Sequence, residues 1–345
     1  MISRRWSIAL AALLTAALAI VTPLVGGGID LLTALKDFSA AGQHLTPDGL
    51  IFWQTRLPRV MTALIAGAAL ACSGLAYQAV LRNPLADPYI LGVSSGAAMG
   101  KAIAVLLVPA AWAASALATP VLCFAGAVAP VVMLARLARR QQRFSPVTLL
   151  LAGTIVNLVL SAAMMLVQVF ANPDSARQIT YWWLGGLDVA GYRAPLMALP
   201  FVVAGVLVLM LRARAMNLMS VDALTASHLG VDVPREARWM LGAGTLLAAV
   251  AVALCGPIGF AGLLVPHILR LAFGPDHRRL VPLCALAGAG FLLLCDLVGW
   301  RGMMLWPAQD MNVKQIPTGV ITALLGGPVF LWLLVKGRGG ASRSY

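Results

Sequence analysis

The sequence has few charged residues, and acidic ones are especially scarce. Only 11% of its 345 residues are charged, with 12 Asp or Glu against 25 Lys or Arg, while 61% are hydrophobic. A soluble domain with this composition would expose far more apolar surface than it could bury. The composition therefore excludes an ordinary soluble protein and indicates a chain whose solvent is lipid.

The chain also lacks the patterns that mark metal, disulfide and nucleotide sites. Its five cysteines lie in apolar runs without C-x-x-C spacing, which indicates packing residues. Its four histidines are scattered, and no H-E-x-x-H pair occurs. The stretch 95–102 resembles a P-loop but has Ser95 and Ala102 where Gly and Ser or Thr are needed. We therefore predict no catalytic residue, no metal and no cofactor bound by this chain.

Long apolar runs dominate the sequence instead. A helix that crosses a bilayer needs roughly 20 mostly apolar residues. The first run follows Arg4 and Arg5 like a signal peptide, but its Gly26-Gly27-Gly28 exit lacks an A-x-A cleavage pattern, so we interpret it as a span. The runs predict an all-α polytopic membrane protein with about ten transmembrane helices and one transmembrane domain, 1–345. The predicted helices are 7–25, 60–80, 91–110, 114–135, 147–171, 194–211, 239–258, 262–273, 281–300 and 315–335.

The basic residues predict the orientation. With the N-terminus inside, most of the 25 lie in cytoplasmic segments, as the positive-inside rule requires. We therefore expect both termini to be cytoplasmic. The net charge of +13 then reflects helix ends at anionic lipid, because neither a dense basic patch nor a DNA-reading motif is present. We expect no nucleic-acid partner.

Glycines predict both close packing and a break. Gly92, Gly96 and Gly100 recur every four residues, which lets a second helix approach closely, either within the subunit or in a dimer. The stretch 256–262 contains three glycines and Pro257, too many breakers for an undisturbed helix. Such a break inside a membrane is tolerated only when protein or a wet cavity surrounds it. We predict that it borders a pathway, with a plain outer hairpin as the alternative.

One predicted cytoplasmic loop is too long for a simple connection. Ser220 can cap a short helix with Asp222 in its first turn, Gly230 can end that helix, and Asp232 before Pro234 can begin a second. Apolar side chains on these helices predict a protein partner, with helices lying on the membrane as the alternative. They are Leu218, Met219, Leu224 and Leu229.

A series of motifs follows one order along nearly the whole chain. They are Arg56-Leu-Pro-Arg59, Gln78-Ala-Val-Leu-Arg-Asn-Pro-Leu-Ala-Asp-Pro88, Gly92-Val-Ser-Ser-Gly96, Leu150-Leu-Ala-Gly153, Tyr181-Trp-Trp-Leu-Gly185, Gly256-Pro-Ile-Gly-Phe-Ala-Gly-Leu-Leu-Val-Pro-His-Ile-Leu-Arg270 and Pro317-Thr-Gly-Val-Ile-Thr-Ala-Leu-Leu-Gly-Gly-Pro328. In these motifs the chain resembles the FecCD-type permeases of ABC importers for cobalamin, ferric siderophores and haem.

The resemblance implies a type II ABC importer permease fold in the bacterial inner membrane. It implies a homodimer with one translocation path on the two-fold axis. It also implies two cytoplasmic ATPase subunits, which hold ATP and Mg, and a periplasmic substrate-binding protein. The loop 216–235 would supply the coupling helices that dock on the ATPase.

The resemblance also assigns roles to individual residues. Arg56 and Arg59 would dock the binding protein by charge pairs. The family usually has a further arginine in its penultimate span, at the position of Trp300 in this chain, and Arg301 would take over its role. The loop that follows Arg301 is longer than in the family and would reshape the outer mouth. The gate residues would be Asn83, Leu85, Ser145 and Thr148. The ATPase-coupling residues would be Ser220, Asp222, Leu224, His228, Leu229 and Gly230.

Five further residues are assigned to the pathway or to the membrane interface: Arg177, Tyr181, Trp182, Trp183 and Lys101. In a short outer helix after Arg177, the aromatics Tyr181, Trp182 and Trp183 either anchor the helix at the interface or line the cargo entrance. Lys101 lies inside a span, where an ammonium group needs a partner or water, and we favour a buried hydrogen bond over cargo contact.

The resemblance, together with these features, implies a permease subunit that moves a metal chelate from periplasm to cytoplasm and breaks no covalent bond. Haem is the favoured cargo because the outer mouth is rich in Met, Trp and basic residues; a ferric siderophore and cobalamin are the alternatives. An ion-coupled secondary transporter is less favoured, since Asp296 is the only acidic residue near a span interior. An intramembrane enzyme would need a nucleophile–base pair that the sequence lacks.

Overall fold

The fold is a bundle of long helices, seen in a computed structural model that describes residues 4–25, 33, 46–108, 118–140, 146–187, 191–304 and 316–341. The ten predicted spans are confirmed as helices within these ranges, and seven are long and apolar enough to cross a membrane. The ten are α1 (Arg4–Leu24), α4 (Leu57–Leu81), α5 (Val93–Leu107), α7 (Ala118–Arg140), α8 (Pro146–Phe170), α10 (Arg193–Val221), α12 (Val233–Cys255), α13 (Ala261–Phe273), α14 (His277–Met304) and α15 (Thr318–Ala341).

Five shorter elements lie between the spans within the described residues. The sequence predicted α9 as a short helix after the fifth span, and Asn172 caps it through a bond from the Ser175 amide. The segment before α4 is a π-helix, a geometry often found at functional positions. The five are α3 (Pro47–Ile51), η1 (Phe52–Arg56), η2 (Pro88–Leu91), α9 (Pro173–Trp183) and α11 (Ala223–His228).

Helix α4 lies at the centre of the bundle, where most of its side chains are buried. Its glycines allow its neighbours to touch its backbone: a Cβ at Gly67 would overlap the carbonyl group of Gly288 in α14, and one at Gly74 would overlap Gly262 in α13. Small residues at such crossings are typical of helices packed in membranes. Helix α4 is therefore the element against which the other helices are positioned.

The predicted glycine face of α5 packs within the subunit. A Cβ at Gly96 would overlap the Gly126 carbonyl oxygen of α7, and one at Gly100 would overlap that of Leu122. Gly92 has φ +85° and ends η2, a conformation that favours glycine. The internal alternative for this face is thereby confirmed.

The predicted break after α12 is also confirmed. Helix α12 ends at Cys255, and Gly256 and Phe260 both have positive φ before α13 begins. The Tyr89 hydroxyl donates to the Ile258 carbonyl at 3.1 Å and accepts from the Ile258 amide at 3.0 Å. Protein groups therefore satisfy this broken backbone, as the membrane interior requires.

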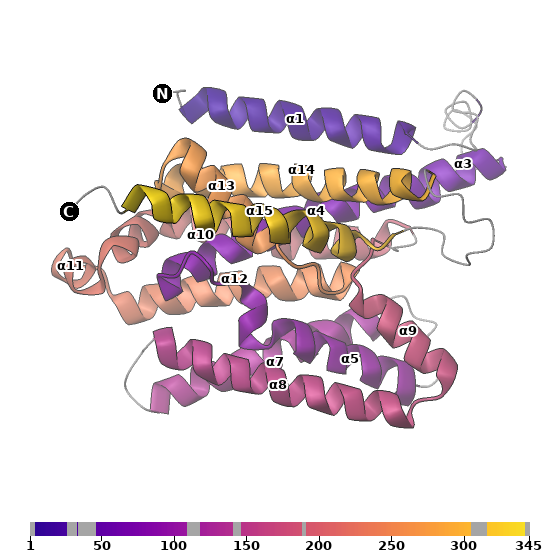
Figure 1. Cartoon of the computed structure of the whole chain (residues 1–345), viewed down its shortest axis with the longest axis horizontal. Coiled ribbons are helices and arrows are strands. Elements are labelled where there is room, and N and C mark those ends of the chain that lie inside the picture. Colours follow the sequence, from indigo (N-terminus) through magenta and orange to yellow (C-terminus); the bar gives the residue numbers. More distant parts are fainter. Residues whose placement is uncertain are drawn as a thin grey trace.

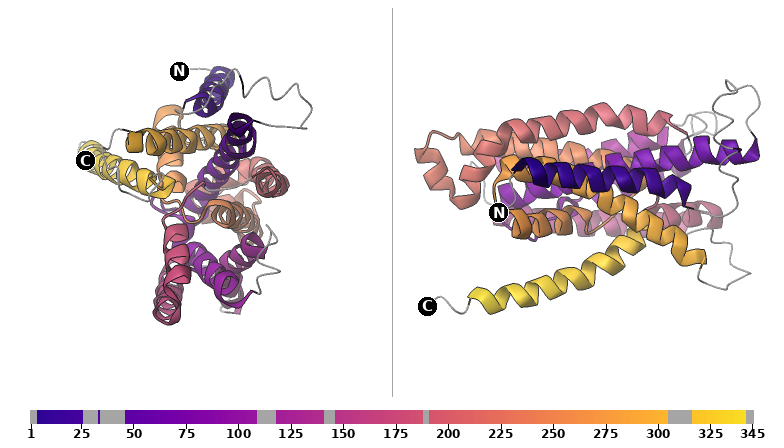
Figure 2. Two further views of the ribbon diagram at one scale, coloured as in Figure 1. Left: turned by 90° about the vertical axis from the view of Figure 1, so that its right-hand side faces the viewer. Right: turned by 90° about the horizontal axis from the view of Figure 1, so that it is seen from above.

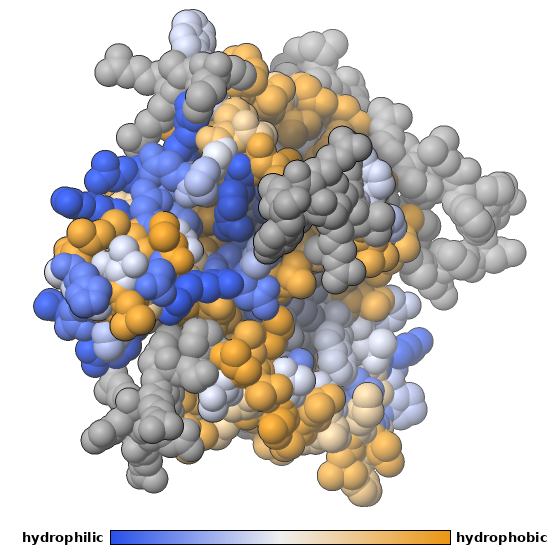
Figure 3. All heavy atoms as spheres, turned by 60° about the vertical axis from the view of Figure 1, so that its left-hand side comes forward, coloured by the Kyte–Doolittle hydropathy of each residue, from blue (hydrophilic) through white to orange (hydrophobic). Residues whose placement is uncertain are grey.

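The bundle has two distinct ends. Figure 1 shows both chain termini and α11 at one end, and α3 and α9 at the other. We call these the α11 end and the α9 end. Figure 3 shows hydrophilic side chains gathered around the α11 end, beside hydrophobic surface. The structure thus places both termini on the same side of the bundle.

Candidate functional site

At the α9 end, Arg59 and Asp296 form a buried ion pair between α4 and α14. Arg59 Nε donates to Asp296 Oδ2 at 2.8 Å and Nη2 to Oδ1 at 2.6 Å, a bidentate arrangement. The Thr318 hydroxyl at the start of α15 also donates to Asp296 Oδ1, at 3.0 Å. Asp296 is 3% exposed and Arg59 7% exposed. Three helices therefore meet at one carboxylate.

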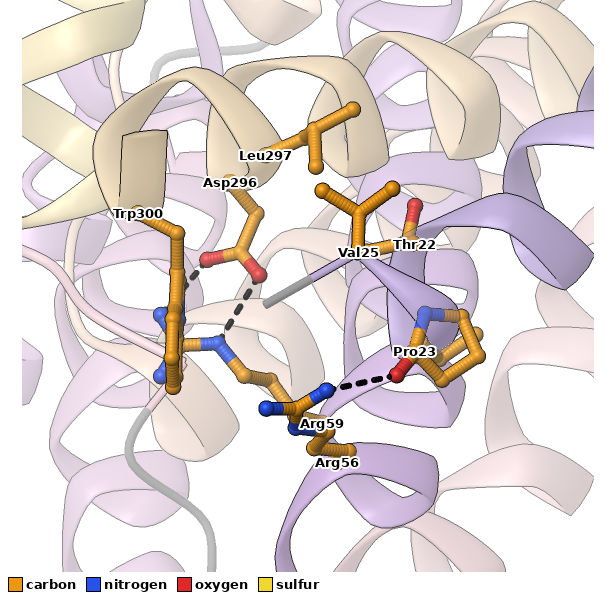
Figure 4. A pocket seen from close by; sticks show the side chains of 9 residues that line it. Thr22, Pro23, Val25, Arg56, Arg59, Asp296, Leu297 and Trp300 are labelled. Carbon is orange, nitrogen blue, oxygen red and sulfur yellow. Dashed lines mark hydrogen bonds and ion pairs between the residues drawn. The ribbon is translucent and has the colours of Figure 1, made fainter. Parts of the chain in front are cut away.

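Arg56 and Trp300 extend this cluster to α1. Arg56 Nη1 donates to the Pro23 carbonyl at 2.9 Å, and Arg56 is 6% exposed. The Trp300 ring lies beneath both guanidinium groups, at 5.8 Å from Arg56 Cζ and 5.4 Å from Arg59 Cζ. The side chains enclose a cavity of about 20 Å³, room for one water molecule. Figure 4 shows them converging on this space from the end of α1, η1, α4 and α14.

The docking prediction assumed arginines that face the solvent. In this structure the guanidinium groups of Arg56 and Arg59 face protein instead. Docking through Arg59 would therefore require a partner carboxylate to replace that of Asp296. The backbone of Arg301 lies in α14, and the enlarged loop that follows lies mostly outside the described residues.

At the α11 end, the predicted N-cap at Ser220 is wrong. Helix α10 continues to Val221, and the Ser220 hydroxyl donates to the Asn217 carbonyl within that helix. Asp222 caps α11 instead, because its Oδ2 accepts the Thr225 amide at 2.9 Å. This hydrogen bond lowers the pKa of Asp222, and the Thr225 hydroxyl, the Ala223 amide and, least of all, Arg82 at 3.8 Å add to the effect.

The predicted second short helix is also corrected, because Asp232 caps the long helix α12 at the Arg235 amide. Gly230 has φ +83° and follows α11, as predicted for a helix end. His228 lies exposed in the last turn of α11. Leu224 and Leu229 are 71% and 62% exposed. Helix α11 is thus a short capped helix with apolar side chains outside the bundle.

A hydrogen-bonded joint that the sequence did not reveal fixes the end of α10. Asn217 Nδ2 donates to Asp276 Oδ1 at 2.7 Å, and Asn217 Oδ1 accepts the His277 amide at 2.7 Å. The Asn217 Oδ1 atom also lies 2.8 Å from His277 Nδ1. These bonds attach the segment before α11 to the start of α14. No spacing in the sequence could indicate them, since the partners are 60 residues apart.

The predicted gate residues occupy the turn after α4 and the start of α8. Arg82 has φ +47° and ends α4, and Asn83 Oδ1 accepts the Leu85 amide at 2.9 Å. A cavity of about 400 Å³ adjoins this turn, and Arg270 of α13 lines it with its guanidinium group bonded to Gln78 at 3.0 Å. Thr148 lies exposed in the first turn of α8, and Ser145 is outside the described residues.

The predicted pathway residues lie on α9 and α5. Arg177 forms an exposed ion pair with Asp174 at 2.8 Å, and Tyr181 is 57% exposed. Trp182 and Trp183 pack against a small cluster that includes Ala98 and Ala102 of α5. Lys101 is 8% exposed and near Cys123 of α7, and no hydrogen bond from its ammonium group is found among the described residues.

Helix α8 has the least burial of the long spans. Only 11% of its most apolar 18-residue window is buried, against 83% for α4. Figures 1 and 2 show α8 and α15 on the same side of the bundle. Large apolar side chains are exposed on both. They include Leu151, Ile155, Leu158, Val159, Leu324 and Leu331.

Comparison with known proteins gives consistent matches. Residues 9–336 match the FecCD transport family. The vitamin B12 import system permease protein BtuC of Escherichia coli O9:H4 (strain HS) is 40% identical over 311 residues, which cover 89% of this chain and 90% of BtuC. The uncharacterized ABC transporter permease protein YvrB of Bacillus subtilis (strain 168) is 40% identical over 296 residues, 85% of this chain and 81% of YvrB.

A solved structure matches the fold over nearly its whole length. It is described as an inward-facing conformation of a metal-chelate type ABC transporter. The TM-score is 0.79 at 28% sequence identity, and the match covers 95% of this chain and 98% of the other.

Proposed function

Because this chain belongs to the FecCD transport family and is a permease subunit of an ABC transporter, we propose that it carries a metal held in a large planar macrocycle from the periplasm to the cytoplasm. Cobalamin is the first candidate cargo and haem the second. The observation that carries the proposal is the 40% identity with BtuC over nine-tenths of that protein. This subunit is not itself catalytic, so the energy of ATP reaches it through a partner.

The ATPase partner would bind at the α11 end, which is then cytoplasmic, as are both termini. Leu224 and Leu229 offer the apolar contact. The Asp222 cap, its ion pair with Arg82, and the Asn217 joint would pass motion of α11 to α4 and α14 as a rigid body. The gate turn at Asn83 follows Arg82 directly, so it would move with α11.

A second copy of the chain would cover the face formed by α8 and α15. Exposed apolar side chains on a membrane protein tolerate lipid, but α8 is the least buried of the seven long apolar spans, with 11% of its most apolar window buried against 17% to 83% for the others. Pairing of two such faces would place a path between the subunits, bounded by Thr148 and Asn83 at the cytoplasmic end. The homodimer would then hold two ATPases.

The substrate-binding protein would dock at the α9 end. Arg177 and Tyr181 are exposed there. Docking by Arg59 would be coupled to loosening of its bond to Asp296, because a buried arginine cannot satisfy two carboxylates in the same geometry. Binding of the loaded partner would thereby break this ion pair between α14 and α4, while the close backbone contact of Gly67 with Gly288 remains. Docking by Arg56 would compete with its bond to the Pro23 carbonyl.

The choice between cargoes follows from two observations of different weight. Haem is supported by a mouth rich in Met and Trp, but residues 305–315 of that mouth are outside the described residues. Cobalamin is supported by named relatives that cover 89% and 88% of the chain. A ferric siderophore is the remaining member of the chelate class.

The test is uptake into proteoliposomes that contain this chain, its ATPase and its binding protein. Labelled cobalamin should accumulate with ATP and saturate, and unlabelled haem should not compete. Saturable uptake of haem without uptake of cobalamin would reverse the order of the two cargoes. ATP-dependent uptake of neither, with a siderophore taken up instead, would overturn the macrocycle proposal.

A further inference from the structure

A groove between α7 and α12 has no role in the transport proposal. Its volume is about 590 Å³, within the range of small-molecule sites. Its floor is apolar and buried, formed in part by Leu91, Leu134 and Leu149. Val132 on the α7 rim is 40% exposed. A second hollow continues along α7 and shares Val132 with the groove.

Gly242 of α12 keeps this groove open. Most glycines in the helix crossings described above lie so close to a neighbour that a Cβ would overlap it. At Gly242, which is exposed and lines the groove, a Cβ would meet nothing within 4 Å. Glycine in a helix interior is less favourable than alanine by up to about 1 kcal/mol, and close packing does not explain it here. What Gly242 provides is space.

The floor of the groove suits a hydrocarbon chain, because its polar side chain is already hydrogen-bonded within the protein. Thr245 is the polar side chain of the floor, and its hydroxyl is bonded to Tyr77 at 2.8 Å and to the Leu241 carbonyl at 2.6 Å. A polar ligand would therefore find no free hydrogen-bond donor on this side chain. An apolar chain gives up no hydrogen bond when it binds there, and it removes the apolar side chains that line the groove from contact with water.

Positive charge is confined to one end of the groove. Arg238 in the first turns of α12 lines the groove, and Arg136 near the end of α7 lines the adjoining hollow. The two helices are antiparallel, so both arginines lie at the α11 end. Both are exposed, and neither has an ion-pair partner among the described residues; Arg238 Nε donates to the Pro234 carbonyl, which leaves its two terminal nitrogens for another acceptor.

We propose that the α7–α12 groove binds an anionic phospholipid of the cytoplasmic leaflet. One acyl chain lies along the floor beside Gly242, and the phosphate contacts Arg238 and Arg136. Basic sites between spans on the cytoplasmic side are typical positions for anionic headgroups. The assignment to the cytoplasmic leaflet rests on the membrane orientation given in the proposed function. The rest of this proposal depends neither on that orientation nor on the identity of the cargo.

The size of the charge effect sets the expected selectivity. A basic residue near the membrane surface contributes about 1 kcal/mol toward an anionic lipid. Two arginines should therefore favour phosphatidylglycerol over phosphatidylcholine by about 20- to 30-fold in dissociation constant. The acyl chain contributes equally for both lipids, since both have the same tails.

The experiment is native mass spectrometry of the full chain purified with its ATPase, delipidated and titrated with phosphatidylglycerol or phosphatidylcholine. Phosphatidylglycerol should remain bound at one molecule per copy of this chain. Arg136→Gln with Arg238→Gln should weaken it to the level of phosphatidylcholine. Gly242→Leu should weaken both lipids, because its side chain occupies the groove. The matched control is Arg214→Gln, which removes an exposed arginine of α10 outside the groove and should change nothing.

Two results would overturn the proposal. One is equal retention of both lipids by the unaltered chain, which would indicate ordinary annular contact. The other is unchanged phosphatidylglycerol binding after Gly242→Leu and after Val132→Trp, which fills the groove from the α7 side. Each variant counts only if it elutes with the ATPase as the unaltered chain does, and having two keeps the test valid if one misfolds.

Discussion

Loss of Arg59 should destabilise the protein far more than loss of the whole Arg59–Asp296 pair. Arg59→Met would leave the Asp296 carboxylate, which is 3% exposed, with Thr318 as its remaining described partner. Removing one member of a buried ion pair typically costs about 3–5 kcal/mol, because the other charge is left uncompensated. The double variant Arg59→Met with Asp296→Asn has no such charge and still allows the Thr318 bond.

The double variant should therefore lose about 1–2 kcal/mol, the net worth of the missing hydrogen bonds. Asp296→Asn alone should also cost about 3–5 kcal/mol, because it leaves the buried Arg59 charge uncompensated. The interaction energy from the double-mutant cycle, which subtracts both single losses from the double loss, should then be about 4–9 kcal/mol in magnitude. The assay is reversible unfolding in mixed micelles of sodium dodecyl sulfate and a mild detergent, followed by tryptophan fluorescence. The matched control is Arg177→Met, which breaks an exposed pair with Asp174 and should have little effect.

Additive losses in this cycle would refute the assignment of a buried pair. They would indicate that Arg59 and Asp296 do not depend on each other, and hence that Arg59 is free to meet an external partner. The same variants would then be expected to fail only in docking of the binding protein.

Three further predictions concern packing and coupling. Gly74→Ala should destabilise the chain by about 1–3 kcal/mol or more in the unfolding assay, since its Cβ would overlap the α13 backbone. Gly242→Ala should be neutral or slightly stabilising, because its Cβ would meet no neighbour. Equal effects of the two variants on stability would contradict the packing described. Leu224→Asp with Leu229→Asp should release the ATPase during purification, and unchanged co-purification would place that contact elsewhere. Asn217→Ala should leave the ATPase bound but lower transport per ATP hydrolysed, and an unchanged ratio would remove this joint from the coupling route.

The sequence predicted the helices well because the bilayer fixes their length. A run such as 147–171 has nearly the bounds of α8, since apolarity and the thickness of the membrane determine both ends. Outside the membrane this constraint is lost. Helix α10 extends ten residues beyond the predicted end at 211, to Val221, because its last turns contain no breaker and pack against protein. Ser220 and Asp222 are both good caps, and the sequence could not choose between them.

The buried cluster at the α9 end shows a different limit. The sequence contains Asp296 as a lone acidic residue near a span interior, and a buried carboxylate needs a cation. Arg59 is 237 residues away, however, and only the packing of α14 on α4 brings the two together. Residue type could therefore indicate that Asp296 needs a partner, but not which arginine provides it.

The most direct test of the account is the mass of the intact particle purified from native membranes in mild detergent. The account predicts two copies of this chain with two copies of a nucleotide-binding subunit, and loss of that subunit in the Leu224→Asp, Leu229→Asp variant. A particle that contains this chain without any nucleotide-binding subunit would contradict it.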